Sequence, residues 1–373
     1  MNKVFPPKTL SAHEAITEAQ RIAYAPMVFQ AVRSLRELGI LGVLDAAGKP
    51  GTTLAAITTE LGLSRYGMGV LVESGVSAGV IDALGSEPGH SDGDDCFALS
   101  KVGYFLLHDP MTRVNMDFNH AICYEGLHKL DEAITTGTPA GLAAIDKQHE
   151  TVYEALRHLP DDLQKSWYAF DHYYSDVAYP AALKMILERK PASLVDIGAN
   201  QGRFSILTAQ NDEAIKITMV DLPEQLSNGL ALTAAAGFAD RIDGVGMDIR
   251  EAGKALPAGR DAYWLSQFIC CFSEEEMVSI LERVATAMTE QSTLYILETC
   301  WDRQREEAAA FALVNTSLYF TCIANGNSKM YTAKDLLKCI DKAGLHCDQL
   351  TDGVGNYHTL FSCSKAPTGQ APS

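Results

Sequence analysis

Glycines and one carboxylate follow a short apolar run at 193–195, in a spacing that suits a ligand-binding turn. From residue 195 the chain reads VDIGANQGRF, so Gly198 and Gly202 bracket a turn into a helical pattern. Glycine has no Cβ, which lets a backbone approach a ligand closely. Asp196 stands where the apolar run ends. The segment predicts a buried strand, a binding loop and a helix.

A second carboxylate, Asp221, ends the next apolar run at 217–220. It lies roughly 20 to 25 residues beyond the loop, the distance at which an acid on the second strand accepts hydrogen bonds from both hydroxyls of a ribose. Two glycines after a strand occur in many α/β proteins, and the acid at this distance strengthens the interpretation. The pair of segments predicts an adenosine-type cofactor.

The spacing D-x-G-x-x-x-G narrows the choice of cofactor. It lacks the G-x-G-x-x-G turn that seats a dinucleotide pyrophosphate at a helix N-terminus, so NAD is disfavoured. S-adenosylmethionine has no phosphates, and backbone groups, a carboxylate and space suffice for its methionine end. We therefore expect S-adenosylmethionine as cofactor, with S-adenosylhomocysteine as its product.

These segments belong to a C-terminal half in which short apolar runs alternate with helical patterns. That alternation is typical of a doubly wound, Rossmann-like α/β sheet of parallel strands. The expected strands are 193–195, 217–220, 242–245, 262–265, 293–297 and 359–362.

The N-terminal half is mostly helical in pattern. Helical periodicity predicts one long amphipathic helix from Ala12 to about Gly51, and 53–83 resembles a helix-turn-helix. Strands at 79–81 and 96–100 would form a small wing with its tip at 85–95. Its second helix carries Arg65 as its one base, so we interpret it as an interaction module rather than a DNA reader.

Two further helical stretches connect the halves. The first runs from Phe118 to Ile134 and ends at the stop signal 136–139, and the second covers 161–188 as one or two helices rich in aromatic residues. The expected domains are a winged-helix-like dimerisation domain at 1–110, connecting helices at 111–190, a cofactor-binding domain at 191–365 and a disordered tail at 366–373.

Composition limits the class of protein. The chain has 373 residues and a net charge of −17, which disfavours nucleic acid and membrane surfaces as partners. Its nine cysteines lack C-x-x-C spacing, so reduced thiols are expected and a disulfide framework or metal site is not. We see no signal peptide and no membrane span, and expect a cytoplasmic protein.

With these motifs the chain resembles the S-adenosylmethionine-dependent small-molecule O-methyltransferases of the caffeate, acetylserotonin and hydroxyindole type, including their bacterial secondary-metabolism relatives. The resemblance implies a homodimer acting on a small aromatic acceptor. It rests on the cofactor segments and on 136–139, 246–248 and 331–336. The implied cofactor residues are Asp196, Gly198 and Gly202 for the methionine end, Asp221 for the ribose, Met247 and Asp248 for the adenine, and Leu222 and Ser266.

The chain departs from this family at the catalytic position. Where the family has His and Asp, the segment 265–276 reads LSQFICCFSEEE, with Cys270 and Cys271. Glu298 matches an acid that steers the family's catalytic His. A general base contributes about 10²- to 10⁴-fold, so its loss need not abolish transfer.

Three alternatives follow from the replaced base. Cys270 could act as a base if its pKa fell, His172 or Tyr173 could take the role, or a phenol ring carbon could be the nucleophile. Cys271 we interpret as a small core residue. The expected catalytic set is Cys270, Glu298 and His172, and the expected acceptor set is Phe170, Tyr173, Tyr174, Asn315 and Tyr319.

The predicted activity is methyl transfer to a phenolic metabolite, with oxygen favoured over carbon as the acceptor atom. Glu274, Glu275 and Glu276 indicate a solvated helix start rather than a metal site. A catalytically silent S-adenosylmethionine-binding regulator is the rival from another class, and an NAD-dependent oxidoreductase is disfavoured by the missing phosphate loop.

Overall fold

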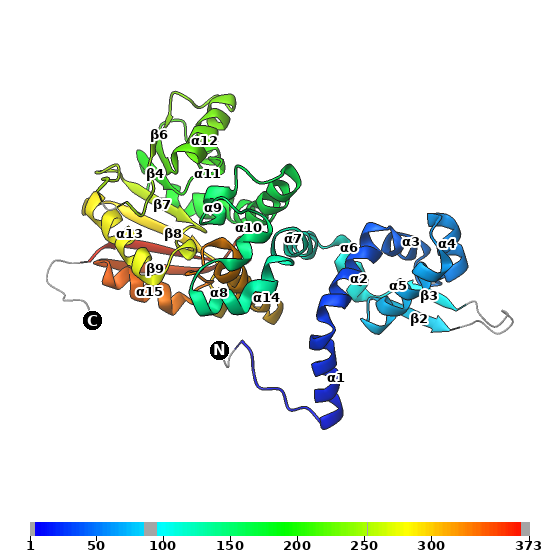
Figure 1. Ribbon diagram of the computed structural model, residues 1–373. Coiled ribbons are helices and arrows are strands. Elements are labelled where there is room, and N and C mark those ends of the chain that lie inside the picture. Colours follow the sequence, from blue (N-terminus) through cyan, green and yellow to red (C-terminus); the bar gives the residue numbers. More distant parts are fainter. Residues whose placement is uncertain (1–3, 86–94, 252, 367–373) are drawn as a thin grey trace. The chain divides into compact units, whose positions relative to one another are not determined.

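The computed structural model describes residues 4–85, 95–251 and 253–366 (Figure 1). These residues form two compact units. One covers Pro7–His120, and the other covers the described chain from Ala121 onward together with its first few residues. The expected tail at 366–373 lies almost wholly outside the described residues, as does most of the expected wing tip.

A seven-stranded sheet forms the centre of the C-terminal unit, in the order β6-β5-β4-β7-β8-β10-β9. The first five strands of this order are parallel, as the sequence predicts, and the last two are antiparallel. The strands are β4 (Ser193–Ile197), β5 (Lys216–Asp221), β6 (Ile242–Gly246), β7 (Ala262–Ser266), β8 (Thr293–Glu298), β9 (Leu345–Val354) and β10 (His358–Lys365).

The expectation of a wholly parallel sheet was therefore wrong at one edge. The predicted strand at 359–362 exists as β10 but runs antiparallel to β8, and β9 was not predicted. Strand β9 lies at the sheet edge and its side chains are mostly polar and solvent-exposed, so it lacks the apolar run by which the other strands were found. A hairpin at 355–357 joins the two strands.

Helices pack on both faces of this sheet. A buried cluster joins α10, α11 and the sheet, where the rings of Phe204 and Trp264 stack with centroids 4.1 Å apart. Helix α10 is one continuous helix of 27 residues with Pro180 inside it. The helices are α8 (Leu130–Thr136), α9 (Val152–Ala155), α10 (Asp161–Leu187), α11 (Arg203–Asn211), α12 (Pro223–Ala235), α13 (Glu274–Ala287), α14 (Glu307–Tyr319) and α15 (Ala333–Lys342).

Helix α14 continues as a π-helical turn to Ala324. By length and composition alone the combined helix Glu307–Ala324 could cross a membrane, and 44% of it is buried inside the protein. Buried helices of globular cores pass the same test. In this structure the helix supplies Leu313, Tyr319 and Phe320 to the interior.

The N-terminal unit contains the expected helix-turn-helix and wing, but the long helix is divided. The helix is interrupted at Tyr24, just before Pro26 in the next helix, and again at Gly39, whose φ is 84°. Strand β3 pairs with both β1 and β2. The elements are α1 (Ala12–Ala23), α2 (Ala25–Glu37), α3 (Ile40–Ala47), β1 (Thr52–Thr53), α4 (Leu54–Leu61), α5 (Arg65–Ser77), β2 (Ile81–Gly85), β3 (Cys96–Leu99), α6 (Lys101–His108) and α7 (Pro110–Phe118).

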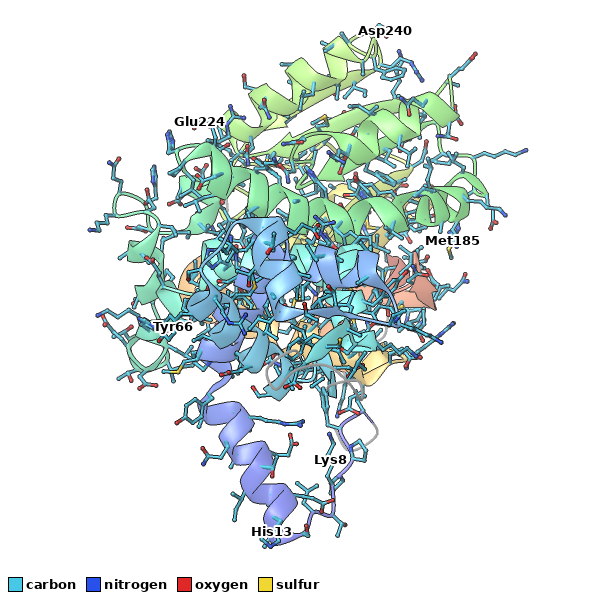
Figure 2. The ribbon with its side chains drawn as sticks, turned by 90° about the vertical axis from the view of Figure 1, so that its right-hand side faces the viewer. Lys8, His13, Tyr66, Met185, Glu224 and Asp240 are labelled. Carbon is cyan, nitrogen blue, oxygen red and sulfur yellow. The ribbon has the colours of Figure 1, made fainter. Side chains whose placement is uncertain are left out.

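Helix α1 has no buried residue, and Figure 2 shows it extending beyond the rest of its unit, with His13 labelled near its start. Large apolar side chains on α1 and at the start of α2 are open to solvent: Ile16 and Ile22 of α1 are 61% and 76% exposed, and Met27 of α2 is 70% exposed. Exposed apolar side chains grouped on a helix are typical of surfaces that pack against a partner.

The predicted helix from Phe118 to Ile134 is interrupted. A π-helical turn at Asn119–Cys123 and a 3-10 turn at Gly126–Lys129 precede α8. A Cβ on Gly126 would lie 2.7 Å from the carbonyl oxygen of Gly141, so close backbone packing replaces a regular helix here. The predicted stop is confirmed, because α8 ends at Gly137 with φ 69°.

Candidate active site

The loop after β4 has the left-handed backbone that its glycines allow. Gly198 and Gly202 have φ values of 75° and 72°, and Asn200 between them has φ 50°. The Gly198 amide donates to the carbonyl oxygen of Val220 at 2.8 Å, which ties the loop to β5. A Cβ on Gly198 would lie 2.2 Å from the ring of Phe268. Both conformation and space therefore require glycine at position 198.

Asp221 joins three segments at the carboxyl ends of the strands. Its two carboxylate oxygens accept hydrogen bonds from the amides of Asn200 and Leu222, both at 2.7 Å, and its carbonyl accepts from the Met247 amide at 2.9 Å. Burial raises the pKa of Asp221 to about 6. Two backbone N–H donors therefore fix the position of this carboxylate at the carboxyl ends of the strands.

Asp196 is 2% exposed and accepts a hydrogen bond from the Ser205 hydroxyl at 2.6 Å. Burial raises its pKa to about 7, and the nearby charge of Asp221 adds to the effect. Asp248, at the other end of the site, differs because Arg250 pairs with it at 2.7 Å. Burial opposes ionisation of Asp248, but the Arg250 hydrogen bonds outweigh it and lower its pKa.

A cavity of about 270 Å³ lies beside these groups. It brings together most of the predicted residues from segments far apart in the chain. Those that line it are Asp196, Gly198, Asp221, Leu222, Met247, Asp248, Ser266, Cys270, His172, Phe170, Tyr174 and Tyr319. Predicted residues that do not line it are Gly202, Glu298, Tyr173 and Asn315.

Aromatic side chains form a further part of the cavity wall, and one of them, Phe268, packs against the loop at Gly198. The Trp167 indole N–H donates to the hydroxyl of Tyr319 at 2.8 Å, and Phe268 and Phe272 meet edge to face at 5.0 Å. The Tyr153 hydroxyl is buried in this wall, and among the described residues it has no hydrogen-bond partner of normal geometry. Such a wall suits a flat aromatic ligand.

Glu298 holds the catalytic segment through its backbone. Its Oε1 accepts hydrogen bonds from the amides of Phe268 at 3.0 Å, Ile269 at 3.0 Å and Cys270 at 3.3 Å. Burial raises the pKa of Glu298 to about 7. Because it does not reach the cavity, its placement is that of a positioning residue rather than a group that touches an acceptor.

Cys270 is 7% exposed and lines the cavity. Its neighbours oppose a thiolate, because the hydrogen bond with Cys271, burial and the charge of Glu298 all raise the pKa of Cys270 well above its ordinary value. A thiol that stays protonated at neutral pH cannot take a proton from an acceptor. The alternative in which Cys270 is the base is thus disfavoured by its surroundings.

His172 reaches the cavity from α10 and stacks against Tyr168, with ring centroids 5.5 Å apart. Burial lowers its pKa to about 4, so the imidazole is neutral at pH 7. Its Nε2 lies 4.0 Å from a carboxylate oxygen of Asp171. A neutral imidazole can accept a hydrogen bond from an acceptor hydroxyl.

Two of the expected acceptor residues, Tyr173 and Asn315, lie on α10 and α14 but do not line the cavity. Asn315 lies on the exposed side of α14, where its side-chain amide donates to the carbonyl of Phe311, and Leu313 and Thr316 line the cavity instead. Tyr173 does not line the cavity, while Tyr174 beside it does. A pattern of aromatic residues does not by itself reveal which side of a helix faces a ligand.

The structure adds residues that sequence reasoning missed. Asp171 and Asn200 line the cavity, and so does Gln267, whose φ is 48°. The carboxamide of Gln267 donates to the carbonyl of Asp171 at 3.4 Å and bonds the buried His358 at 2.8 Å. Gln267 directly follows the apolar run of β7 and Asn200 lies three residues after β4, positions that could have marked them.

The charges of the cavity wall fit a ligand that carries positive charge. Its two arginines are already engaged, Arg203 with Asp176 and Arg250 with Asp248, which leaves Asp171, Asp196 and Asp221 without an Arg or Lys partner within the described chain. Ser266 Oγ and Asn200 Oδ1 are also buried without a hydrogen-bond partner in the described residues. A sulfonium and an ammonium group would match this excess of acceptors.

Comparison with known proteins shows similarity to two domain families. Residues 17–86 match the model of the Dimerisation2-like domain, and residues 174–346 match that of the O-methyltransferase domain. The chain is 22% identical to an L-tyrosine C(3)-methyltransferase of Streptomyces lavendulae, over 87% of this chain and 85% of that protein. It is 23% identical to a mitomycin biosynthesis 6-O-methyltransferase of the same species, over 87% and 88%.

Solved structures show the same fold. The S-adenosylmethionine-dependent methyltransferase SibL superposes with a TM-score of 0.69 at 20% identity, covering 93% of this chain and 98% of that one. NcsB1, an O-methyltransferase crystallised with S-adenosylmethionine and 2-hydroxy-5-methyl naphthoic acid, gives 0.65 at 21% identity, covering 91% and 96%. The chain belongs to the S-adenosylmethionine-dependent methyltransferases that join a dimerisation domain to an O-methyltransferase domain.

Proposed function

We propose that the enzyme methylates a hydroxyl group of a small, phenolic aromatic metabolite. The observation that carries this proposal is the continuity of the cavity, which leads from Asp196 and Asp221 to a wall of aromatic side chains. Relatives support the substrate class, because their names include tyrosine and mitomycin and NcsB1 was crystallised with a hydroxynaphthoic acid.

When bound, S-adenosylmethionine supplies a methyl group on a positively charged sulfur. The chain's own contribution is alignment and exclusion of water. Asp221 would hold the ribose and Asp196 the methionine end, while Trp167 and Tyr319, joined by their hydrogen bond, close the opposite wall. Holding two reactants in line accounts for a large share of the rate of such displacements.

We assign His172 as the group that accepts the hydrogen bond of the acceptor hydroxyl. It is neutral at pH 7 and faces the cavity, whereas Cys270 stays protonated. With a pKa of about 4 it is a weak base, so the acceptor hydroxyl must itself be acidic, as in a phenol carrying an electron-withdrawing group. Glu298 keeps the segment at Cys270 in place.

Methyl transfer to a ring carbon ortho to a phenol is the second candidate. It is favoured by the absence of a strong base at Cys270, and by a relative named for C(3)-methylation of tyrosine. Carbon attack leaves the ring proton to be lost after the new bond forms, so a weak base suffices.

One experiment tests both candidates. The enzyme is incubated with methyl-¹³C S-adenosylmethionine and a panel of phenols, hydroxybenzoates, hydroxyindoles and aromatic amino acids, and the label is located by NMR. Label at the chemical shift of an aryl methyl ether supports the first candidate. Label on a ring carbon would replace it with the second, and no transfer to any aromatic acceptor would refute both.

We further propose that the enzyme works as a cytoplasmic homodimer. The match of residues 17–86 to a dimerisation-like domain supports the dimer, as do the exposed apolar side chains of α1. All nine cysteines are free thiols, which suits a reducing compartment.

A further inference from the structure

Asp171 is a carboxylate on the cavity wall to which neither the cofactor motifs nor the acceptor set gives a role. It lies on α10 between the aromatic wall and the loop after β4. Its side chain accepts one hydrogen bond, from the Asn200 amide nitrogen at 3.3 Å, and His172 lies at 4.0 Å. One long hydrogen bond satisfies little of a carboxylate that has up to four acceptor positions.

Among the described residues, both arginines of the cavity wall pair with carboxylates other than Asp171. Arg203 lies near enough to favour its charge, but this arginine pairs with Asp176 on the outside of α10. A carboxylate that is removed from water without a partner is costly, and proteins retain such groups where a ligand completes them.

Asn200, beside Asp171, also has a hydrogen-bond acceptor that is not satisfied within the described residues. The Asn200 side chain donates to Asp171 through its nitrogen, and its Oδ1 is buried with no hydrogen-bond partner among the described residues. The backbone of Asn200 lies in the left-handed region, with φ 50°. Two neighbouring acceptors, one of them a carboxylate, match the N–H donors of one protonated amine.

We propose that Asp171 and Asn200 form a subsite for a primary ammonium group. The ammonium has two possible sources: the methionine end of S-adenosylmethionine, or an amine carried by the acceptor. The second source rests on the proposed function, and the first does not. In both cases the carboxylate of Asp171 is the charged partner and the Asn200 carboxamide fixes the direction of the N–H groups.

The test compares the wild-type chain with Asp171→Asn, which keeps the size of the side chain and an acceptor for Asn200. Asp171→Glu keeps the charge, and Asp162→Asn, an exposed acid of the same helix, controls for net charge. Calorimetry measures binding of S-adenosylhomocysteine and of its deaminated analogue. With S-adenosylhomocysteine saturating, it then measures binding of tyramine and of 4-methylphenol, which differ in the amine-bearing arm.

Loss of a charge-assisted hydrogen bond predicts weakening of the ammonium-bearing ligand by about 10- to 100-fold in Asp171→Asn. If the cofactor is the source, S-adenosylhomocysteine weakens and its deaminated analogue does not. If the acceptor is the source, tyramine weakens and 4-methylphenol does not. Asp171→Glu should recover part of the loss, and Asp162→Asn should bind every probe as the wild type does.

Two results overturn the subsite. One is binding of both S-adenosylhomocysteine and tyramine within twofold of wild type in Asp171→Asn. The other is an equal loss for the amine-bearing and amine-free ligand of each pair, which would mean a general change of shape. Thermal unfolding of each variant verifies that it is folded. Failure of methyl transfer to the aromatic panel would leave the cofactor comparison intact, so the two proposals can fail separately.

Discussion

Replacing Asp171 by Asn should stabilise the ligand-free enzyme, and increasingly so as the pH rises. Burial, with a contribution from the charge of Asp176, raises the pKa of Asp171 from its ordinary value of 3.8 to about 7. The unfolded chain therefore releases this proton near pH 3.8, while the folded chain keeps it until about pH 7. Between these values the folded state binds more protons, so the wild type loses stability as the pH rises.

The size of the effect follows from the same two values. The difference between 3.8 and about 7 corresponds to about 4 kcal/mol at pH 8 if the carboxylate is shielded from water. The Asp171 side chain is 25% exposed to solvent, which reduces the expected gain in unfolding free energy to about 1–3 kcal/mol. For a unit of this size that shifts the melting midpoint by roughly 2–9 °C. Below pH 4 the two proteins should show no pH-dependent difference.

The assay is thermal unfolding of wild type and Asp171→Asn, ligand-free, between pH 4 and pH 8.5 in one mixed buffer of constant ionic strength. The quantity that tests the prediction is how the difference in melting midpoint between the two proteins changes with pH. Asn and Asp also differ in ways that do not depend on pH, and these add only a constant offset. A difference in melting midpoint that stays flat across this range would refute the account of Asp171 as a buried acid that is paired with no Arg or Lys of the described chain. Saturating S-adenosylhomocysteine should shrink the difference if its ammonium pairs with Asp171.

Four other changes test the remaining parts of the site. Gly198→Ala should weaken S-adenosylhomocysteine binding by about tenfold or more in a calorimetric titration, because the new Cβ collides with the ring of Phe268. Gly237→Ala is the control in the same titration, because Gly237 has a similar φ but open space around it, so this variant has the backbone strain without a steric collision. Glu298→Leu removes the oxygen that accepts hydrogen bonds from three backbone amides, so kcat should fall about tenfold or more while cofactor affinity changes less than threefold. Cys270→Ala should keep kcat within about fivefold, since the thiol is not a base, and a loss above a hundredfold would reinstate it. Ile22→Asp places a charge on the exposed face of α1, and light scattering should then find monomers; an unchanged dimer would move the interface elsewhere.

Most residues that we expect to bind the cofactor line the cavity, and they could be located because their determinants are local in sequence. Position 198 needs glycine for its own backbone conformation, and the carboxylate of Asp221 binds the amide of the next residue, Leu222. Both requirements can therefore be recognised from a few neighbouring residues in the sequence. The acceptor half depends on which side of a helix faces inward. Asn315 and Thr316 are adjacent, and only the packing of α14 decides that the second lines the cavity. Strand β9 escaped prediction because an exposed edge strand needs no apolar run.

Asp171 shows most clearly what sequence alone leaves out. In the chain it is one acid among 47, on a helix whose aromatic residues draw attention, and nothing in the local pattern separates it from the exposed Asp176 five residues later. The difference arises only when α10 is packed against the loop after β4. Arg203 then reaches Asp176 and leaves Asp171 facing Asn200 in the cavity. Burial of the Asp171 carboxylate and the pairing of Arg203 with Asp176 both result from the packing of α10 against the loop after β4 and the start of α11. These surroundings, rather than the residue type, give a carboxylate its affinity for a cation.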